Sequence, residues 1–173
     1  AGSHIVVAGG AWTPALARSF KLRVPMQGGK GYSMTLPRPG ALPNLCSLLG
    51  EARVAITPMG EALRVAGTME ICGNDLSVKE RRVQGIIKAA CRVFPGLTPG
   101  EFAGVKRWVG LRPCSPDGLP YLGPVPGRER VIVASGHAML GLSLGPVTGK
   151  LVTEIVTGAR PLIPLDQLVV GRF

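Results

Sequence analysis

Residues that force turns recur along the whole chain and limit the length of any regular element. The 173 residues include 25 glycines and 16 prolines. Proline fixes φ and has no N–H to donate, whereas glycine enters the φ > 0 region at no steric cost. Short strands separated by turns accommodate this pattern better than a helical bundle does. Since 46% of the residues are hydrophobic, we expect a globular α+β (mixed α/β) protein with a sizeable core.

The first half of the chain predicts an antiparallel sheet. Three segments of strand character, "GYSMTL", "RVAITPM" and "LRVAGTMEI", are separated by turns that contain proline or glycine. Before them, "HIVVAGGAW" is typical of a buried strand that enters a tight turn. The segment "TPALARSF" then predicts a short helix with Thr13 as its N-cap and Pro14 in the first helical position.

Two longer helices are expected further along. The apolar residues of "SVKERRVQGIIKAACRVF" fall on one helical face: Val83, Ile86, Ile87, Ala90 and Phe94. Ser77 and Glu80 match the S-x-x-E capping box at its start. The last helix contains Pro146, which is tolerated in a first turn, so we expect it to begin near residues 143–145. Gly158 suits its C-terminal cap.

The chain is strongly basic, with 20 Lys and Arg against 10 Asp and Glu and a formal net charge of +10. Such a charge suits nucleic acid, an anionic membrane or an acidic partner. The basic residues are scattered, however, and 5% aromatic residues are too few for a stacking platform on single strands. We therefore expect no nucleic-acid partner. A fragment that lacks its acidic counterpart would also explain the charge.

The four cysteines lie far apart without a C-x-x-C pair, and there are two histidines. A metal site is therefore not predicted, and separate thiols favour a reducing cytoplasm. No signal peptide or run of 18 apolar residues is found, so we expect no transmembrane segment. The start "AGSH" is typical of a tag remnant and no initiator Met precedes it, which favours a fragment.

The stretch "WVGLRPCSPDGLPYLGP" predicts a stiff loop that carries a single arginine. Arg112 follows an apolar strand and precedes Pro113, so its guanidinium either reaches solvent or binds an anion. The planar fork of an arginine suits a carboxylate bidentately. Asp117, in Ser-Pro-Asp-Gly, is expected to cap its own turn.

A strand, a glycine-rich turn and a helix at residues 131–158 form the other candidate site. The N–H groups at a helix start favour an anion or an electron-rich ring. The glycines at 141, 145 and 149 would equally permit close helix packing, and both interpretations stay open. His137 could act as a base or be positioned structurally. Neither G-x-x-x-x-G-K-[ST] nor G-x-G-x-x-G occurs in the chain.

Taken together, "GLRPCSPDGLPYLGP" and "VIVASGHAMLGLSLGPVTGKLVTEIVTG" resemble the C-terminal part of FAD-dependent amino-acid oxidoreductases, a group that includes D-amino-acid dehydrogenase, glycine oxidase and sarcosine oxidase relatives. Upstream, "VPMQGGKGYSMTLP" and "LRVAGTMEICGNDL" are most similar to the D-amino-acid dehydrogenase branch. The resemblance implies an antiparallel-sheet substrate domain and the C-terminal strand–helix part of a Rossmann-type FAD domain. It also implies a missing N-terminal half with the G-x-G-x-x-G that holds FAD.

The resemblance assigns roles to particular residues. Arg112 corresponds to the arginine that grips the substrate carboxylate, and Tyr32 is a weaker candidate for a substrate contact. The turn against the isoalloxazine ring of FAD corresponds to His137, Ala138, Met139, Leu140, Gly141, Leu142 and Ser143. The helix N-terminus would stabilise negative charge near N1 and O2 of the reduced ring. No catalytic acid or base and no metal ligand is implied.

Three segments follow from this resemblance: residues 1–20 at the edge of the FAD domain, 21–107 as the substrate domain, and 108–173 as the return to the FAD domain. The implied reaction is hydride transfer from a D-amino acid to flavin N5, with the imino acid released as 2-oxo acid and ammonia. Electrons would pass to a quinone or another carrier, and the chain could dock peripherally on the inner membrane face. The isolated chain is expected to be inactive. The alternatives are a cofactorless binding or subunit-contact module and a glycine- or sarcosine-oxidase-like enzyme that uses O₂.

Overall fold

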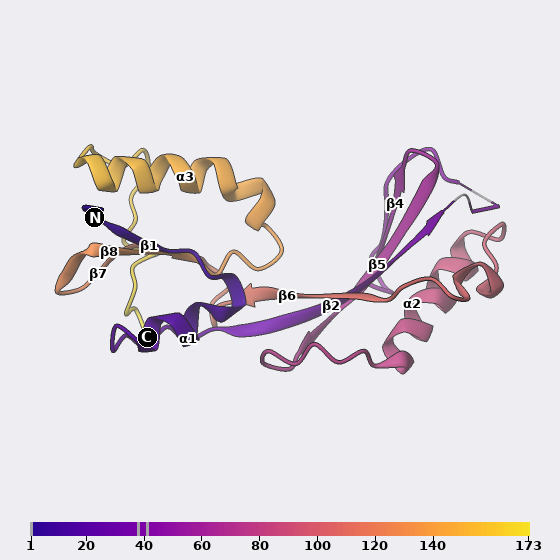
Figure 1. The fold of residues 1–173 in the computed structure, drawn as a ribbon. Helices are drawn as coiled ribbons and strands as arrows, with labels where there is room; N and C mark the ends of the chain where they lie inside the picture. The colour runs from indigo at the N-terminus through magenta and orange to yellow at the C-terminus, as the bar shows by residue number, and fades with distance from the viewer. Residues whose placement is uncertain (1, 38, 41) are drawn as a thin grey trace. The chain divides into compact units, whose positions relative to one another are not determined.

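The computed structural model describes residues 2–37, 39–40 and 42–173, and the chain divides into two compact units. Unit 1 comprises the chain up to Gly29, Cys72–Asn74 and Arg112–Phe173, whereas unit 2 comprises Lys30–Ile71 and Asp75–Leu111. Each unit combines strands with at least one helix (Figure 1). The expected mixed α/β class is therefore confirmed. The assignment of the units to FAD and substrate domains stays a prediction.

Unit 2 is built around the antiparallel sheet that the sequence predicts. Its strands, in spatial order, are β3 (Ser47–Leu49), β4 (Val54–Met59), β5 (Ala62–Ile71), β2 (Gln27–Pro37) and β6 (Trp108–Cys114). The β4–β5 pair is antiparallel, with Ala55 opposite Ala66. The first residues of β2 and the last residues of β6 belong to unit 1.

Helix α2 (Glu80–Val93) supplies the other half of the unit 2 core. The predicted apolar face is confirmed for its buried residues, which are Val83, Ile86, Ile87 and Ala90. They pack in one cluster with side chains of β2, β4 and β5, together with Phe102 from the short 3₁₀ helix η2 (Pro99–Phe102).

The predicted capping box at Ser77 and Glu80 is wrong. The helix begins at Glu80 without a side-chain cap, because the Ser77 hydroxyl donates to Asp75 Oδ2 at 2.8 Å instead. A capping box exists elsewhere, where Thr98 and Glu101 cap η2 reciprocally.

The sheet of unit 1 brings together residues from the two ends of the chain. Its strands lie in the order β1 (Ile5–Val7), β8 (Arg128–Ser135) and β7 (Tyr121–Val125). β1 runs parallel to β8, with Ile5 opposite Val131, and β7 is antiparallel to β8. The strand expected near the N-terminus is present, but it is buried only at Val7, while Ile5 and Val6 are exposed.

The stretch predicted to be one stiff loop is largely strand. β6 continues through Pro113 to Cys114, and β7 contains Pro124. Both are edge strands of their sheets. Proline has no N–H to donate to a neighbouring strand, and edge strands are where a sheet tolerates it. The intervening turn is capped as expected, because Asp117 Oδ1 accepts from the Leu119 N–H at 3.1 Å. Arg172 also binds Asp117 bidentately and lowers the pKa of its carboxyl to about 2.

Two helix starts differ from the prediction. Helix α1 (Thr13–Arg18) has Trp12 rather than Thr13 as its N-cap, since the buried Thr13 hydroxyl donates to Ser135 Oγ on β8 at 2.9 Å. Helix α3 (Gly141–Thr157) begins before residues 143–145, which places Pro146 in the second turn. Gly158 ends α3 at φ 72°, as expected of a C-terminal glycine cap. Among the described residues, no helix combines the length and apolar character needed to cross a bilayer.

Candidate functional site

The turn between β8 and α3 has an unusual backbone. Gly136 has φ +89° and Ala138 has φ +48°, so two residues of a short connection lie in the left-handed region. A Cβ added at Gly136 would also lie 3.3 Å from Tyr121 Cδ2. The positive φ favours glycine at this position, and a side chain there would also require the Tyr121 ring to shift.

The first turn of α3 offers backbone donors to a ligand. Its N-cap, Leu140, makes no side-chain hydrogen bond to the helix, and the first N–H groups of any helix lack intrahelical acceptors. The N–H of Leu144 is the first in the helix that donates to a carbonyl of the preceding turn, that of Leu140, at 2.9 Å. Nearby side chains stand in the open, with Leu142 exposed to 96%. The helix start therefore fits an anionic or electron-rich group.

The structure brings Arg112 next to this turn, within unit 1. The N–H of Ala138 donates to the carbonyl of Pro113 at 2.9 Å, and Cys114 forms an isolated antiparallel bridge with His137. Arg112 itself is half-buried, and its Nη1 donates to the Gly29 carbonyl at 3.4 Å. Two candidate sites separated in sequence are thus joined by backbone hydrogen bonds.

His137 links the turn to the body of α3. Its Nε2 lies 3.0 Å from Oγ1 of Thr148, which lies within α3. Burial lowers the pKa of the imidazole below its ordinary value, which favours the neutral form of the ring. This arrangement agrees with a structurally positioned histidine.

His137 is expected to make folding pH-dependent below neutrality. Because folding lowers the pKa of His137, the unfolded chain binds a proton more readily than the folded chain does. The stability that the neutral imidazole contributes is therefore present above the pKa of the unfolded chain, near 6.5, and is lost as the pH falls below it. The free energy of unfolding, measured with denaturant between pH 7.5 and 5, should fall less steeply in His137→Gln than in the wild type. Equal slopes would rule out this role.

Tyr32 lies in unit 2, in the middle of a buried polar network. Its side chain is 2% exposed, and its hydroxyl donates to Glu70 Oε2 at 3.0 Å. Glu70 also pairs with Lys79, which is the main cause of the lowered pKa of the Glu70 carboxyl. Lys30 is fully buried and its ammonium lies 5.7 Å from the Tyr32 ring centroid. A substrate contact by Tyr32 stays a prediction.

Sequence reasoning missed the second half of this network. The Lys30 ammonium donates to Asp75 Oδ2 at 2.9 Å and to the Ser77 carbonyl at 2.8 Å. The Ser77 N–H and this ammonium together hold the pKa of Asp75 well below its usual value. The sequence did contain one indication, because Lys30 lies in a strand whose other residues are mostly apolar or small. A buried ammonium requires polar partners, so such a lysine predicts an acidic group nearby.

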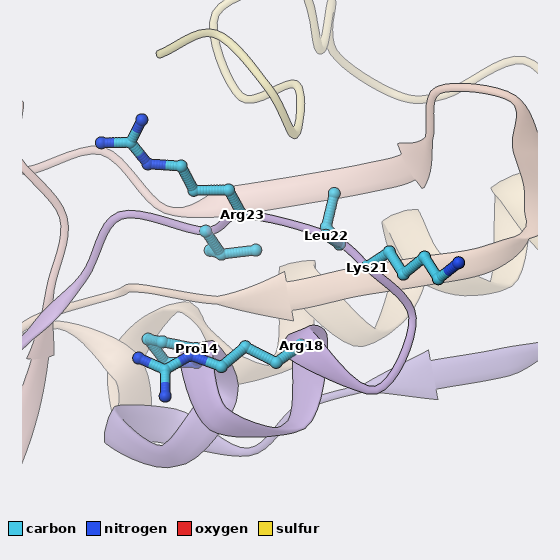
Figure 2. Close-up of a pocket in the computed structure, with 6 residues that line it drawn as sticks. Pro14, Arg18, Lys21, Leu22 and Arg23 are labelled. Atoms are coloured by element: carbon cyan, nitrogen blue, oxygen red, sulfur yellow. The ribbon is translucent and has the colours of Figure 1, made fainter.

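An open pocket of about 280 Å³ lies beside α1. Its lining residues are Pro14, Arg18, Lys21, Leu22, Arg23 and Val24. In Figure 2 the guanidinium groups of Arg18 and Arg23 extend toward one side, whereas Lys21 points the opposite way. The pocket contains none of the residues predicted for the site. Among the described residues, no group of three or more His, Cys, Asp or Glu could hold a metal ion.

Comparison with known proteins gives consistent matches across the chain. The matching family, over residues 1–155, is described as FAD dependent oxidoreductase (DAO). A D-amino acid dehydrogenase from Xanthobacter autotrophicus is 36% identical over 170 residues, which are 97% of this chain and 40% of that protein. A glycine oxidase from Pseudomonas putida is 34% identical over 175 residues and covers 100% of this chain and 47% of that protein.

The fold also matches a solved structure. Glycine oxidase from Geobacillus kaustophilus superposes with a TM-score of 0.85 at 28% identity, over 100% of this chain and 46% of that chain. The chain therefore spans less than half the length of each of these relatives.

Proposed function

Because the chain belongs to the FAD dependent oxidoreductase (DAO) family, we propose that it forms part of an enzyme that oxidises D-amino acids. The relatives include proteins named D-amino acid dehydrogenase and glycine oxidase. One observation carries the proposal: the backbone pairing that holds Arg112 beside the turn at residues 136–140. This pairing supports the proposal that Arg112 binds the substrate carboxylate and that the start of α3 binds the ring, since both belong to unit 1.

The residues at the start of α3 fit the flavin of FAD. The uncapped N–H groups of Gly141, Leu142 and Ser143 would face an electron-rich edge of the ring and stabilise negative charge there. The open turn and the exposed side chains of Met139 and Leu140 leave room for a planar group. FAD would supply the hydride acceptor.

The chain's own contribution to the reaction is to bind and orient the substrate. Arg112 would hold the carboxylate with its planar fork, which fixes the direction of the Cα–H bond. Oxidation removes a hydride from Cα and a proton from the amine, and water then converts the imino acid into a 2-oxo acid and ammonia. No side chain of the turn has to act as an acid or base in this proposal.

The remaining part of the proposal concerns the further protein segment and the electron acceptor that the enzyme needs. We propose that FAD binding and turnover require a further segment with G-x-G-x-x-G, and that a quinone or another carrier accepts the electrons. A glycine-oxidase-like enzyme that uses O₂ is the second candidate, favoured by the fold match to a glycine oxidase. Consumption of O₂ during turnover would distinguish the two.

A fusion with the remaining part of a relative tests directly whether the chain forms part of such an enzyme. Residues 1–173 are fused to the remaining part of the Xanthobacter autotrophicus relative, and the product is purified and mixed with D-alanine without O₂. We expect a yellow protein whose flavin absorbance is bleached by D-alanine and not by L-alanine, while glycine reports on the second candidate. The chain alone should remain colourless. A fusion that binds no flavin, or binds it without bleaching by any of the three, would favour a cofactorless module.

A further inference from the structure

A second pocket lies in unit 2, on the face of the sheet opposite α2. Its volume is about 410 Å³, and it is lined by Ser33, Thr35, Arg64, Lys106 and Trp108. Ser33 and Thr35 alternate along β2 with the buried residues that pack toward α2, so they point to the other face. The pocket therefore combines a floor of hydroxyl groups, an aromatic ring and two cationic side chains.

Arg64 is held in place by the pocket itself. Its Nη2 donates to Ser33 Oγ at 3.1 Å, and its guanidinium carbon lies 5.5 Å from the centroid of the Trp108 ring. The indole in turn lies against the backbone of Gly110, where an added Cβ would come within 2.3 Å of Trp108 Cη2. The arginine is thus positioned before any ligand arrives, which reduces the entropy lost on binding.

No acidic residue that the structure describes balances the charge of the pocket. None of the lining residues is acidic, and neither Arg64 nor Lys106 forms an ion pair with any residue that the structure describes. An arginine stays protonated in proteins, so the positive charge is permanent. Trp108, which is 54% exposed, offers a ring surface beside these donors.

We propose that this pocket binds a small anion through its carboxylate or phosphate groups, with Arg64 and Lys106 as the charged contacts and Trp108 as a surface for a planar part of the ligand. The inference is independent of the proposed function. The basic pocket beside α1 supports no similar proposal, because Lys21 points away from Arg18 and Arg23 (Figure 2) and no aromatic residue lines the pocket.

Fluorescence of Trp108 measures binding at this site. The 173-residue chain with Trp12→Phe leaves Trp108 as the single indole. It is titrated with phthalate, a dianion on a planar ring, and with inorganic phosphate, against chloride of matched ionic strength. We expect a saturable change with phthalate, weakened at least tenfold by Arg64→Gln and about fivefold by Lys106→Gln. Gly110→Ala should displace the indole and also weaken binding.

Arg82→Gln is the matched control, because it removes the same charge from the exposed face of α2. Binding in Arg82→Gln should equal that of the parent. Lys106 is exposed and makes no side-chain hydrogen bond to a described residue, so Lys106→Gln tests the site even where Arg64→Gln fails to fold. Three results would each overturn the proposal: no saturation with either anion, unchanged affinity in Lys106→Gln, or an equal loss in Arg82→Gln.

Discussion

Arg112→Ala should lower kcat/KM for D-alanine by about 30-fold to several thousand-fold in the FAD-loaded fusion protein. The loss of one charge-assisted contact that leaves a buried charge unpaired is worth about 2–5 kcal/mol, and each 1.4 kcal/mol corresponds to about tenfold. Most of the effect should fall on KM, since Arg112 binds a carboxylate that does not react. Arg112→Lys should be intermediate, because an ammonium keeps the charge and loses the bidentate fork.

The control for Arg112 is Arg160→Ala, which removes an exposed arginine from the same unit. Its kinetics should match the wild type. Flavin content and the thermal transition should be unchanged in both variants, so that a loss of activity reports on the substrate. A normal KM in Arg112→Ala would assign the carboxylate to another residue.

Phe102→Ala is expected to cause the largest loss of stability. The side chain is 1% exposed and packs in the same cluster as α2 and the sheet of unit 2. Removal of a buried phenyl ring costs about 3–5 kcal/mol, because contacts are lost and the cavity closes only in part. Denaturant unfolding followed through Trp108, again with Trp12→Phe, measures the effect on unit 2.

Phe173→Ala is the matched control for the ring deletion, since Phe173 is 53% exposed at the end of the chain. We expect a change within about 0.5 kcal/mol. A loss below about 1 kcal/mol in Phe102→Ala would mean that the core of unit 2 does not depend on η2.

Periodic patterns predicted the elements that the structure confirms. Strands β2, β4 and β5 and the apolar face of α2 follow from the local spacing of apolar residues. The short strand β3 was not predicted. The Gly158 cap is equally local. Prolines were less informative, because Pro113 and Pro124 lie in edge strands, and a strand's place within its sheet depends on pairing with distant segments.

The polar groups could not be predicted because their partners are remote in sequence. Thr13 binds Ser135, so its hydroxyl does not cap α1 as the local sequence predicts. Tyr32 binds Glu70, which is 38 residues further along the chain. Local motifs such as a capping box describe what a hydroxyl does when no tertiary acceptor competes. For the candidate site, the sequence supplied Arg112 and the glycine-rich turn, while the bridge that joins them appears only in the fold.

The parallel pairing of β1 with β8 has a consequence for how the protein is made. Ile5 lies opposite Val131, and all of unit 2 lies between them in the chain. Closing such a long loop is entropically costly and slow, and on the ribosome it must wait until β8 has emerged. Unit 2 can complete its own sheet and helix as soon as β6 has emerged. Strand β1 therefore stays without its parallel partner until all of unit 2 has been synthesised.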